Sequence, residues 1–249
     1  MGVIRVVWRG VLLLSMIAVA LTEFLFWRDK SLRGRAVWMQ RWSRFTLQAA
    51  GVHVRVVGEP PQDGLLVSNH VGYLDVMVLG SVAPFVFVSK MEVRSWPAAG
   101  ALTRAAGTIF LDRGSRAATS SVTAQMEQRI KAHVPVVMFP EGTSSDGTGL
   151  LPFRSSLFEA PVALGAAIHV ACVRYSVPDD PASVQTVREK VAYWGDMTFM
   201  GQLPRLLGLK RVDALVEFSP VPVAAKDRKT AAGEAEAMVR AMLEAPDLP

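Results

Sequence analysis

Reactive side chains are scarce in this chain of 249 residues, which has one cysteine, four histidines and three tyrosines. The single cysteine, Cys172, excludes a disulfide framework and any zinc site that needs several cysteines. Cys172 lies in an apolar run, so we expect a buried, inert thiol. His53, His133 and His169 have no partners at the spacings of a metal site, and we expect the protein to hold no metal and no cofactor.

Charged residues are also few, at 20% of the chain against 51% hydrophobic residues. This composition excludes an intrinsically disordered chain, because it can bury enough apolar surface to offset the entropy lost on ordering. The formal net charge of +5 is unevenly distributed. Residues 1–50 contain eight Lys and Arg and two acidic residues, a net +6, which leaves −1 for the rest of the chain. Residues 51–249, which form the body of the protein, are thus nearly neutral, and this argues against a nucleic-acid partner.

Three sequence motifs with well-understood chemistry are absent. There is no G-x-S-x-G nucleophile elbow, no G-x4-G-K phosphate-binding loop and no G-x-G-x-x-G dinucleotide-binding turn. The sequence therefore gives no support to a serine hydrolase of that type, a P-loop nucleotide hydrolase or a dinucleotide-dependent dehydrogenase.

The N-terminal fifth of the chain is apolar and basic. Residues 10–22 are uncharged, a run shorter than the ~20 residues of a membrane-spanning helix. Bulky and charged residues follow at 26–30, which argues against a signal-peptide cleavage site. In residues 35–50, one helical face carries an aromatic stripe flanked by arginines, a pattern typical of a helix in a membrane interface. The stripe consists of Trp38, Trp42, Phe45 and Ala49.

Together these segments predict a helical hairpin at residues 1–50 that dips into one membrane leaflet, with its arginines on anionic head groups. Two alternatives stay open: a single full span with the arginine-rich side in the cytoplasm, or two core helices of a soluble protein. We expect the protein at the cytoplasmic face of the cell inner membrane, with membrane lipids as its partners.

Residues 51–249 form the second expected unit, in which short apolar runs alternate with longer helical patterns. This alternation predicts an α/β fold whose mostly parallel sheet is flanked by helices. The expected strands are 52–57, 65–67, 85–88, 108–111, 134–139, 167–175 and 215–218. The expected helices are 74–82, 115–132, 152–164 and 234–244, with a less regular helical stretch at 184–209.

A polar segment follows the expected strand 65–67, at the strand end where open α/β sheets usually carry their site. It holds His70 and Asp75, five residues apart across a tight turn. A carboxylate so placed can hold one ring nitrogen of His70 and support the imidazolium formed when the other nitrogen takes a proton. The plainer alternative makes Asn69 and Asp75 turn and cap residues beside an incidental histidine.

A second polar segment, Phe139-Pro140-Glu141-Gly142-Thr143, directly follows another buried strand. Glu141 has no apolar role there, and the glycine lets the backbone approach a ligand closely, although small residues also favour an ordinary turn. Cations also follow expected strands or open an expected helix, and cations that meet in one cleft would bind a phosphate. These cations are Lys90, Arg113 and Arg154, each of which could equally be a solvated surface residue.

Taken in order, these segments resemble the glycerolipid acyltransferase family, typified by 1-acylglycerol-3-phosphate acyltransferase. The residues that carry the resemblance span 65–175 and include an intermediate motif between the two polar segments. They are Asn69-His70-x4-Asp75, Lys90-x-Glu92-x4-Pro97-x2-Gly100, Gly107-x-Ile109-Phe110-x2-Arg113 and Phe139-Pro140-Glu141-Gly142-Thr143.

The resemblance implies transfer of a fatty acyl group from a thioester to the free hydroxyl of a lysophospholipid, first of all 1-acylglycerol-3-phosphate, which becomes phosphatidic acid. The thioester would be acyl-coenzyme A or an acylated acyl carrier protein, the second being a protein partner. The resemblance assigns the base to His70, its partner to Asp75, acceptor binding to Glu141, Gly142 and Thr143, and phosphate binding to Lys90 and Arg113.

One position departs from the family pattern, because Ser144 stands where the family commonly has arginine. Arg154 could supply the missing charge. A bacterial branch that acylates lyso-ornithine lipid looks similar here, so a zwitterionic acceptor is the alternative. Two other functions stay open: a lipid-binding protein without catalysis, and a metal-dependent phosphoesterase with His70, Asp75 and Glu141 as ligands. Metal-dependent phosphoesterases usually gather more carboxylates and histidines than this.

Overall fold

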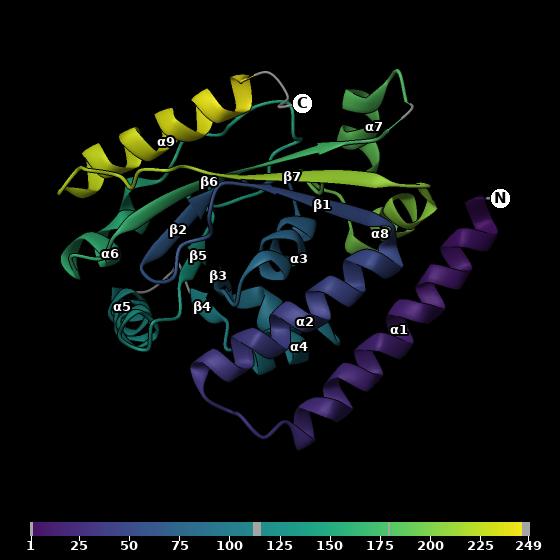
Figure 1. Ribbon diagram of the computed structural model, residues 1–249, viewed down its shortest axis with the longest axis horizontal. Helices are drawn as coiled ribbons and strands as arrows, with labels where there is room; N and C mark the ends of the chain where they lie inside the picture. Colours follow the sequence, from purple (N-terminus) through teal and green to yellow (C-terminus); the bar gives the residue numbers. More distant parts are fainter. Residues whose placement is uncertain (1, 112–115, 179, 246–249) are drawn as a thin grey trace.

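The computed structural model describes residues 2–111, 116–178 and 180–245 (Figure 1). The helices are α1 (Gly2–Phe26), α2 (Leu32–Ala50), α3 (Tyr73–Val82), α4 (Ala99–Ala106), α5 (Arg116–Lys131), α6 (Glu159–Ala163), α7 (Ser183–Lys190), α8 (Phe199–Gly208) and α9 (Arg228–Glu244). Short 3-10 helices lie at η1 (Met91–Ser95) and η2 (Ser155–Phe158). The strands are β1 (Val52–Val57), β2 (Leu65–Ser68), β3 (Val86–Lys90), β4 (Ile109–Leu111), β5 (Val136–Met138), β6 (Ile168–Ser176) and β7 (Val212–Phe218).

The strands form one sheet in the order β1-β7-β6-β2-β5-β3-β4. Neighbouring strands are parallel except β6 and β7, which pair antiparallel. The expected α/β fold with a mostly parallel sheet is therefore confirmed. Four strands run in the same direction, so their carboxyl ends meet at one edge of the sheet. These strands are β2, β5, β3 and β4.

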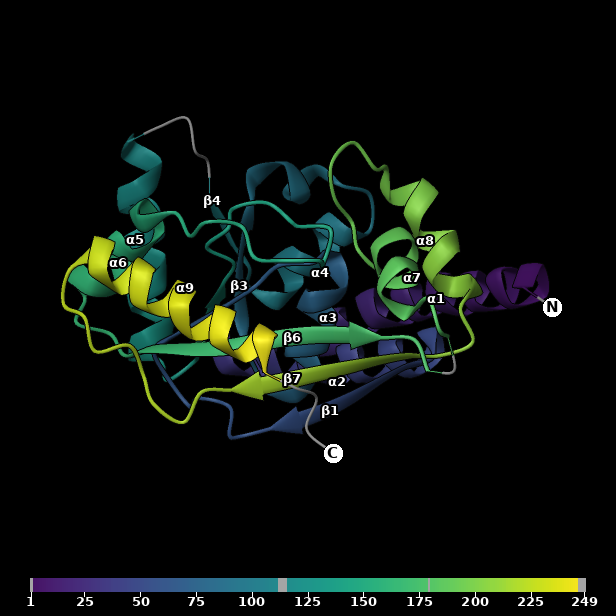
Figure 2. The ribbon, with the colours of Figure 1, turned by 90° about the horizontal axis from the view of Figure 1, so that it is seen from above.

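Helices cover both faces of the sheet, as Figures 1 and 2 show. Helices α2, α3, α7 and α8 contribute to the core on one face, and α5, α6 and α9 to the core on the other. In β2, Leu66 belongs to the first core, whereas Leu65 and Val67 belong to the second. A strand buried on both faces must be apolar throughout, which explains the uninterrupted apolar run that precedes His70.

Two expected helices differ from the structure. The stretch 152–164 is not one helix but a loop, the 3-10 helix η2 and the five-residue α6, because Pro152 and Pro161 lack the N–H that a continuous ladder needs. The stretch 184–209 divides into α7 and α8, and Gly195 in the intervening loop takes a left-handed conformation with φ +58°. Helices η1 and α4 were not predicted from the sequence.

Helices α1 and α2 form the expected N-terminal pair, but the stripe of α2 is divided: Phe45 is exposed, whereas Trp38 and Trp42 contact α1. Trp38 is fully buried, and its ring lies 4.9 Å from that of Phe24 on α1. The Trp42 indole N–H donates to Glu23, also on α1, at 2.9 Å. The prediction that this stripe faces lipid is therefore wrong for Trp38 and Trp42, because the two aromatics join the helices to each other.

The outward apolar surface belongs to α1 instead. This helix has 25 residues and is long and apolar enough to cross a membrane. It is longer than the uncharged run because the helix also includes Arg5 and Arg9 at one end and Glu23 at the other. Its exposed apolar side chains include Val3, Ile4, Val7, Trp8, Val11 and Leu14.

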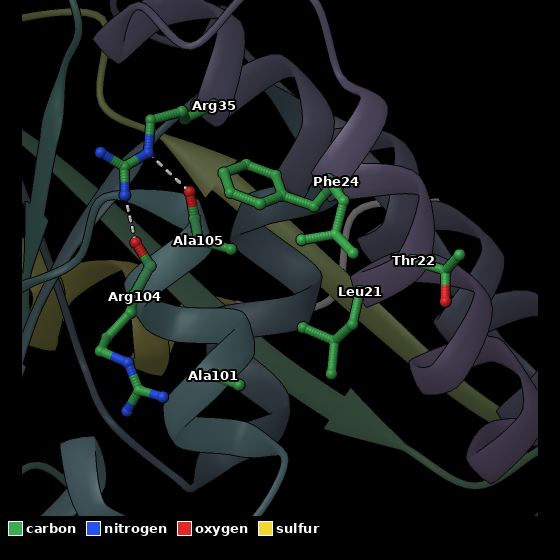
Figure 3. Close-up of a pocket in the computed structure, with 8 residues that line it drawn as sticks. Leu21, Thr22, Phe24, Arg35, Ala101, Arg104 and Ala105 are labelled. Carbon is green, nitrogen blue, oxygen red and sulfur yellow. Dashed lines mark hydrogen bonds between the residues drawn. The ribbon is translucent and has the colours of Figure 1, made fainter.

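Arginines of the N-terminal pair bind the carbonyl ends of helices in the body. Arg5 and Arg9 donate to carbonyls at the end of α8, with Arg5 to Gly208 at 2.8 Å and Arg9 to Leu209 at 2.6 Å. Similar bonds run from Arg44 to Ser81 at the end of α3 (2.8 Å) and from Arg35 to Ala105 at the end of α4 (2.7 Å), the latter drawn in Figure 3. Because helix C-termini carry unpaired carbonyls and a partial negative charge, these cations fasten the pair to the body.

Candidate active site

The turn between β2 and α3 places His70 and Asp75 in contact. Asp75 is fully buried, and its Oδ2 accepts hydrogen bonds from His70 Nδ1 at 2.8 Å and from the backbone N–H groups of Val71 (2.6 Å) and Gly72 (2.9 Å). Asp75 therefore caps the N-terminus of α3 and fixes the imidazole at the same time. The two interpretations of Asp75 from the sequence, cap and histidine partner, describe one arrangement.

The ring of His70 has a second support in Phe139. The two rings stack with centroids 4.1 Å apart and planes 14° from parallel. Phe139 directly follows β5, which lies beside β2, so the sheet sets this contact. With Nδ1 engaged by Asp75 and the ring face by Phe139, Nε2 is the nitrogen oriented for proton exchange. The side chain of His70 is 21% exposed, which allows a substrate to reach it.

Asn69 anchors the same turn to β6. Its buried amide donates to the carbonyl of Val173 and accepts the N–H of Val173, both at 2.8 Å. Strand β6 continues past the end of β2, and the side chain of Asn69 satisfies backbone groups that have no partner strand at that point. Asn69 is thus more than the turn residue that the sequence suggested.

Glu141 joins the two polar segments through their backbones. Its carboxylate is 2% exposed and accepts the N–H of His70 at 2.5 Å and the N–H of Leu151 at 2.9 Å. Burial raises the pKa of Glu141 to about 7, although both N–H bonds act in the opposite direction. Gly142 takes a left-handed conformation with φ +73° and donates to Phe139 at 3.1 Å, a tight turn that directs Glu141 inward.

A third loop completes the support of the turn. The N–H of Ser145 donates to the carbonyl of His70 at 2.7 Å, and the N–H of Tyr193 donates to the carbonyl of Val71 at 2.9 Å. The hydroxyl of Ser144 donates to the carbonyl of Tyr193. The loop after β5 and the loop between α7 and α8 therefore both hold the turn that carries His70.

The other predicted site residues lie along the same edge of the sheet. Lys90 is exposed at the end of β3, Thr143 is exposed in the loop after β5, and the Arg154 N–H donates to the carbonyl of Pro140 at 2.9 Å. Arg113 lies outside the described residues. The structure brings His70, Asp75 and Glu141 into one hydrogen-bonded unit. Lys90 and Arg154 are exposed neighbours of that edge and not members of the unit.

A hollow of about 350 Å³ opens beside this edge. Its apolar lining comes from strands β3, β4 and β5 and from α5, and Arg154 and Glu159 stand among its polar residues. Met138, one of the lining residues, directly precedes Phe139. A second hollow, of about 440 Å³, lies between α1, α2 and α4, and its lining includes no residue of the predicted site (Figure 3).

One residue of the site, Tyr175, was not predicted from the sequence. Its hydroxyl donates to Asp75 Oδ1 at 2.6 Å from β6, 100 residues further along the chain. A signal was available, because Tyr175 lies near the end of β6 and shares the two-residue period of Ala171 and Val173. Phe139 belongs to the second polar segment, but sequence spacing does not predict its contact with His70.

The arrangement suits general base catalysis. A buried carboxylate that holds Nδ1 fixes the tautomer of His70, and its negative charge stabilises the imidazolium formed when Nε2 accepts a proton. The sulfur of Cys172 is fully buried, and burial raises its pKa to about 12, so this thiol is not placed to act as a nucleophile.

Comparison with known proteins identifies the family. The family model described as Acyltransferase matches residues 52–176. The lyso-ornithine lipid O-acyltransferase of Pseudomonas aeruginosa is 33% identical over 98% of this chain and 95% of its own length. The 1-acyl-sn-glycerol-3-phosphate acyltransferase of Neisseria gonorrhoeae is 31% identical over 90% of each chain.

The fold also has a solved counterpart. The 1-acyl-sn-glycerophosphate (LPA) acyltransferase PlsC of Thermotoga maritima superposes with a TM-score of 0.68 over 99% of this chain and 98% of that chain, at 15% identity. This likeness concerns the fold. The family match and the two relatives carry the assignment, and the chain belongs to the acyltransferase family.

Proposed function

We propose that this acyltransferase moves a fatty acyl group from a thioester to the free hydroxyl of a lysophospholipid, with His70 as the general base. The observation that carries the proposal is the contact between His70 Nδ1 and the buried carboxylate of Asp75 at 2.8 Å, with His70 itself partly exposed. General base catalysis contributes roughly 10²–10⁴-fold, so positioning of the two substrates must supply much of the remaining acceleration.

The proposed reaction needs no acyl-enzyme. His70 Nε2 takes the proton of the lysolipid hydroxyl as its oxygen attacks the thioester carbonyl. The carbon–sulfur bond then breaks, and the imidazolium returns the proton to the departing thiolate. Asp75 stabilises the imidazolium while it exists. The donor would be acyl-coenzyme A or acylated acyl carrier protein.

The hollow beside β3, β4 and β5 supports a place for the acyl chain. Apolar side chains of β3, β4, β5 and α5 line part of it, beside Arg154 and Glu159, and it lies at the strand ends that also carry the turn with His70. Burial of a hydrocarbon chain contributes about 0.8 kcal/mol of favourable binding free energy for each methylene removed from water. We propose that this hollow receives the fatty chain that is transferred.

The proposed acceptor site lies on the loop after β5 and at the neighbouring strand ends. Gly142 and Thr143 would face the acceptor, Glu141 would act there through the loops that it joins, and Lys90 and Arg154 would meet an anionic head group. Arg113, expected beside them, lies outside the described residues. The cations favour 1-acylglycerol-3-phosphate as acceptor and phosphatidic acid as product, in phospholipid biosynthesis.

A second acceptor, lyso-ornithine lipid, is favoured by Ser144. This side chain donates to the carbonyl of Tyr193, so the position offers no cation to a phosphate. The relative from Pseudomonas aeruginosa named above is a lyso-ornithine lipid O-acyltransferase. A zwitterionic head group needs less positive charge than a phosphate monoester.

The proposed location is the cytoplasmic face of the cell inner membrane. The support is α1, which lies along the outside of the molecule (Figure 1) and carries exposed apolar side chains. Both proposed substrates carry fatty chains that partition into a bilayer. An anchor of this kind, as a monotopic helix or a single span, would hold the active site beside these substrates.

The test is an acyl transfer assay of the purified protein with both thioesters against both lysolipids. Product with 1-acylglycerol-3-phosphate supports the first acceptor, whereas exclusive use of lyso-ornithine lipid replaces it with the second. The variant Ser144→Arg should shift the preference toward the phosphate. The variant His70→Ala must be inactive yet folded, and substantial transfer by it would overturn the assignment of the base.

A further inference from the structure

The second carboxylate oxygen of Asp75 accepts a hydrogen bond from Tyr175. His70 and two backbone N–H groups all bind Oδ2, whereas Oδ1 accepts the Tyr175 hydroxyl at 2.6 Å. We propose that Tyr175 is a positioning residue for acyl transfer: its hydroxyl holds the Asp75 carboxylate in place and shares its negative charge, and so sets how firmly Asp75 holds the His70 imidazolium. This inference rests on the proposed role of His70 as the base.

The register of the sheet explains why Tyr175 lies there. Ser68, the last residue of β2, pairs with Ala171, and β6 continues for five residues beyond that point. Ala171, Val173 and Tyr175 alternate along β6 and therefore share one face of the sheet. Ala171 and Val173 belong to the core that includes α3, the helix that carries Asp75. The tyrosine is thus delivered to the carboxylate by a strand and not by a loop.

The strand is also tied to the turn that it serves. The buried amide of Asn69 makes two hydrogen bonds of 2.8 Å with the backbone of Val173, two residues before Tyr175. Strand and turn therefore move together, which keeps the short hydrogen bond between Tyr175 and Asp75 in register. A site held by rigid elements keeps its geometry better than one held by side chains alone.

The hydroxyl of Tyr175 is suited to remain a donor. Burial, followed by the negative charge of Asp75, raises the pKa of Tyr175 well above its usual value. The group therefore stays protonated at the pH of an enzyme assay. A hydrogen bond from a neutral hydroxyl to a carboxylate is among the strong, charge-assisted class.

Loss of this hydroxyl has a defined effect on the pH dependence of the reaction. Without the donor, the carboxylate charge is less neutralised and holds the imidazolium more tightly, so a higher pH is needed to free the base. The other titratable groups that interact with Asp75 or Tyr175 are Glu141 after β5, Cys172 on β6 and Tyr73 on α3. Glu141 and Cys172 are unchanged in every variant whose pH profile is compared.

The test is Tyr175→Phe, measured as kcat, as KM for the acceptor and as the pH profile of kcat/KM. We expect kcat to fall about tenfold, KM to change less than about twofold, and the acidic limb to move up by roughly half a pH unit. In an Asp75→Asn background, Tyr175→Phe should cost less than about a further twofold, because the path to His70 is already broken.

The matched control is Tyr73→Phe, run for kcat and KM. It removes a buried tyrosine hydroxyl that makes no hydrogen bond within the described residues. We expect its kinetics to equal those of the wild type. A Tyr175→Phe enzyme with wild-type kcat and pH profile overturns the inference. Tyr175→Phe could instead lower kcat without moving the pH profile, and lower it by the same factor in the Asp75→Asn background. That result shows a merely structural role for Tyr175 and also overturns the inference.

A second measurement covers the case in which Tyr175→Phe does not fold. With three tyrosines in the chain, replacement of all of them by 3-fluorotyrosine keeps the hydroxyl and makes it a stronger donor. The acidic limb should then move to lower pH, and an unmoved limb contradicts the inference. Transfer by His70→Ala would instead refute the proposed base, which keeps the two failures apart.

Discussion

The backbone N–H of His70 donates to the carboxylate of Glu141, 71 positions further along the chain, at 2.5 Å. The other oxygen of the same carboxylate accepts the N–H of Leu151. Two polar segments that are separate in sequence thus form one unit, with Glu141 inside it. The position of the imidazole depends on this unit as much as on its contact with Asp75.

Asp75→Asn should reduce kcat by about 10³–10⁴-fold, the scale seen when an aspartate that orients a catalytic histidine becomes an amide. His70 and both N–H groups bind the same oxygen, so an NH₂ in that position would face three donors, whereas an amide oxygen there accepts their bonds without the negative charge that supports the imidazolium. Initial-rate kinetics checks this. Circular dichroism must show an intact fold, and wild-type activity would favour a lipid-binding protein without this chemistry.

Glu141→Gln should change how stability depends on pH. The pKa of Glu141 is raised in the folded protein from the ordinary 4.5 to about 7, so the folded state binds the proton more tightly than the unfolded chain. The wild type therefore loses stability as pH rises from about 4.5 through about 7, by at most about 1.4 kcal/mol per pH unit from this group.

The glutamine cannot ionise, so the free energy of unfolding of Glu141→Gln should rise relative to the wild type between these pH values. Urea unfolding at a series of pH values measures the difference. Glu59→Gln, at an exposed position, is the control and should leave the slope as it is. If the free energies of unfolding of Glu141→Gln and the wild type change with pH in parallel, the expected titration is contradicted.

Asn69→Ala should destabilise the protein by about 2–4 kcal/mol. It removes two hydrogen bonds of 2.8 Å and leaves the buried N–H and carbonyl of Val173 without these partners. Thermal or urea unfolding gives the value. The control is Gln62→Ala, an exposed amide whose bond to Pro60 is local, and it should cost less than about 0.5 kcal/mol.

A double substitution on α1, Val7→Glu with Val11→Glu, should weaken binding to lipid vesicles at least tenfold, roughly the effect of losing one buried apolar side chain. Both side chains are more than half exposed, so the change should leave the unfolding transition in place. Vesicle co-sedimentation measures the binding. Val184→Glu, at an exposed valine of α7, is the control; equal binding by all three proteins would show that α1 does not contact lipid.

Periodicity predicted most of the sheet correctly, because strands such as β2 and β5 are buried on both faces and must be continuously apolar. It failed where local chemistry interrupts a helical pattern, at Pro152, Pro161 and Gly195. It also misplaced the aromatic face of α2. A stripe of large aromatics looks the same in sequence whether it meets lipid or, as for Trp38, a second helix.

The pairing of His70 with Asp75 was predictable because both residues lie in one turn, where five positions of spacing nearly fix the distance. Asn69, Glu141 and Tyr175 could be placed only by the fold. Their partners lie 71 to 104 positions away, and a sheet register that no local pattern encodes brings them together.

Composition and short-range spacing were enough to predict the apolar strands, the basic N-terminal segment and the residues able to exchange a proton. The tertiary structure decided what those residues bind. Arginines of the N-terminal helices bind helix ends, Glu141 binds backbone, and Asp75 receives a tyrosine from β6 as well as its histidine. Long-range partners depend on strand order and register, which are properties of the whole chain.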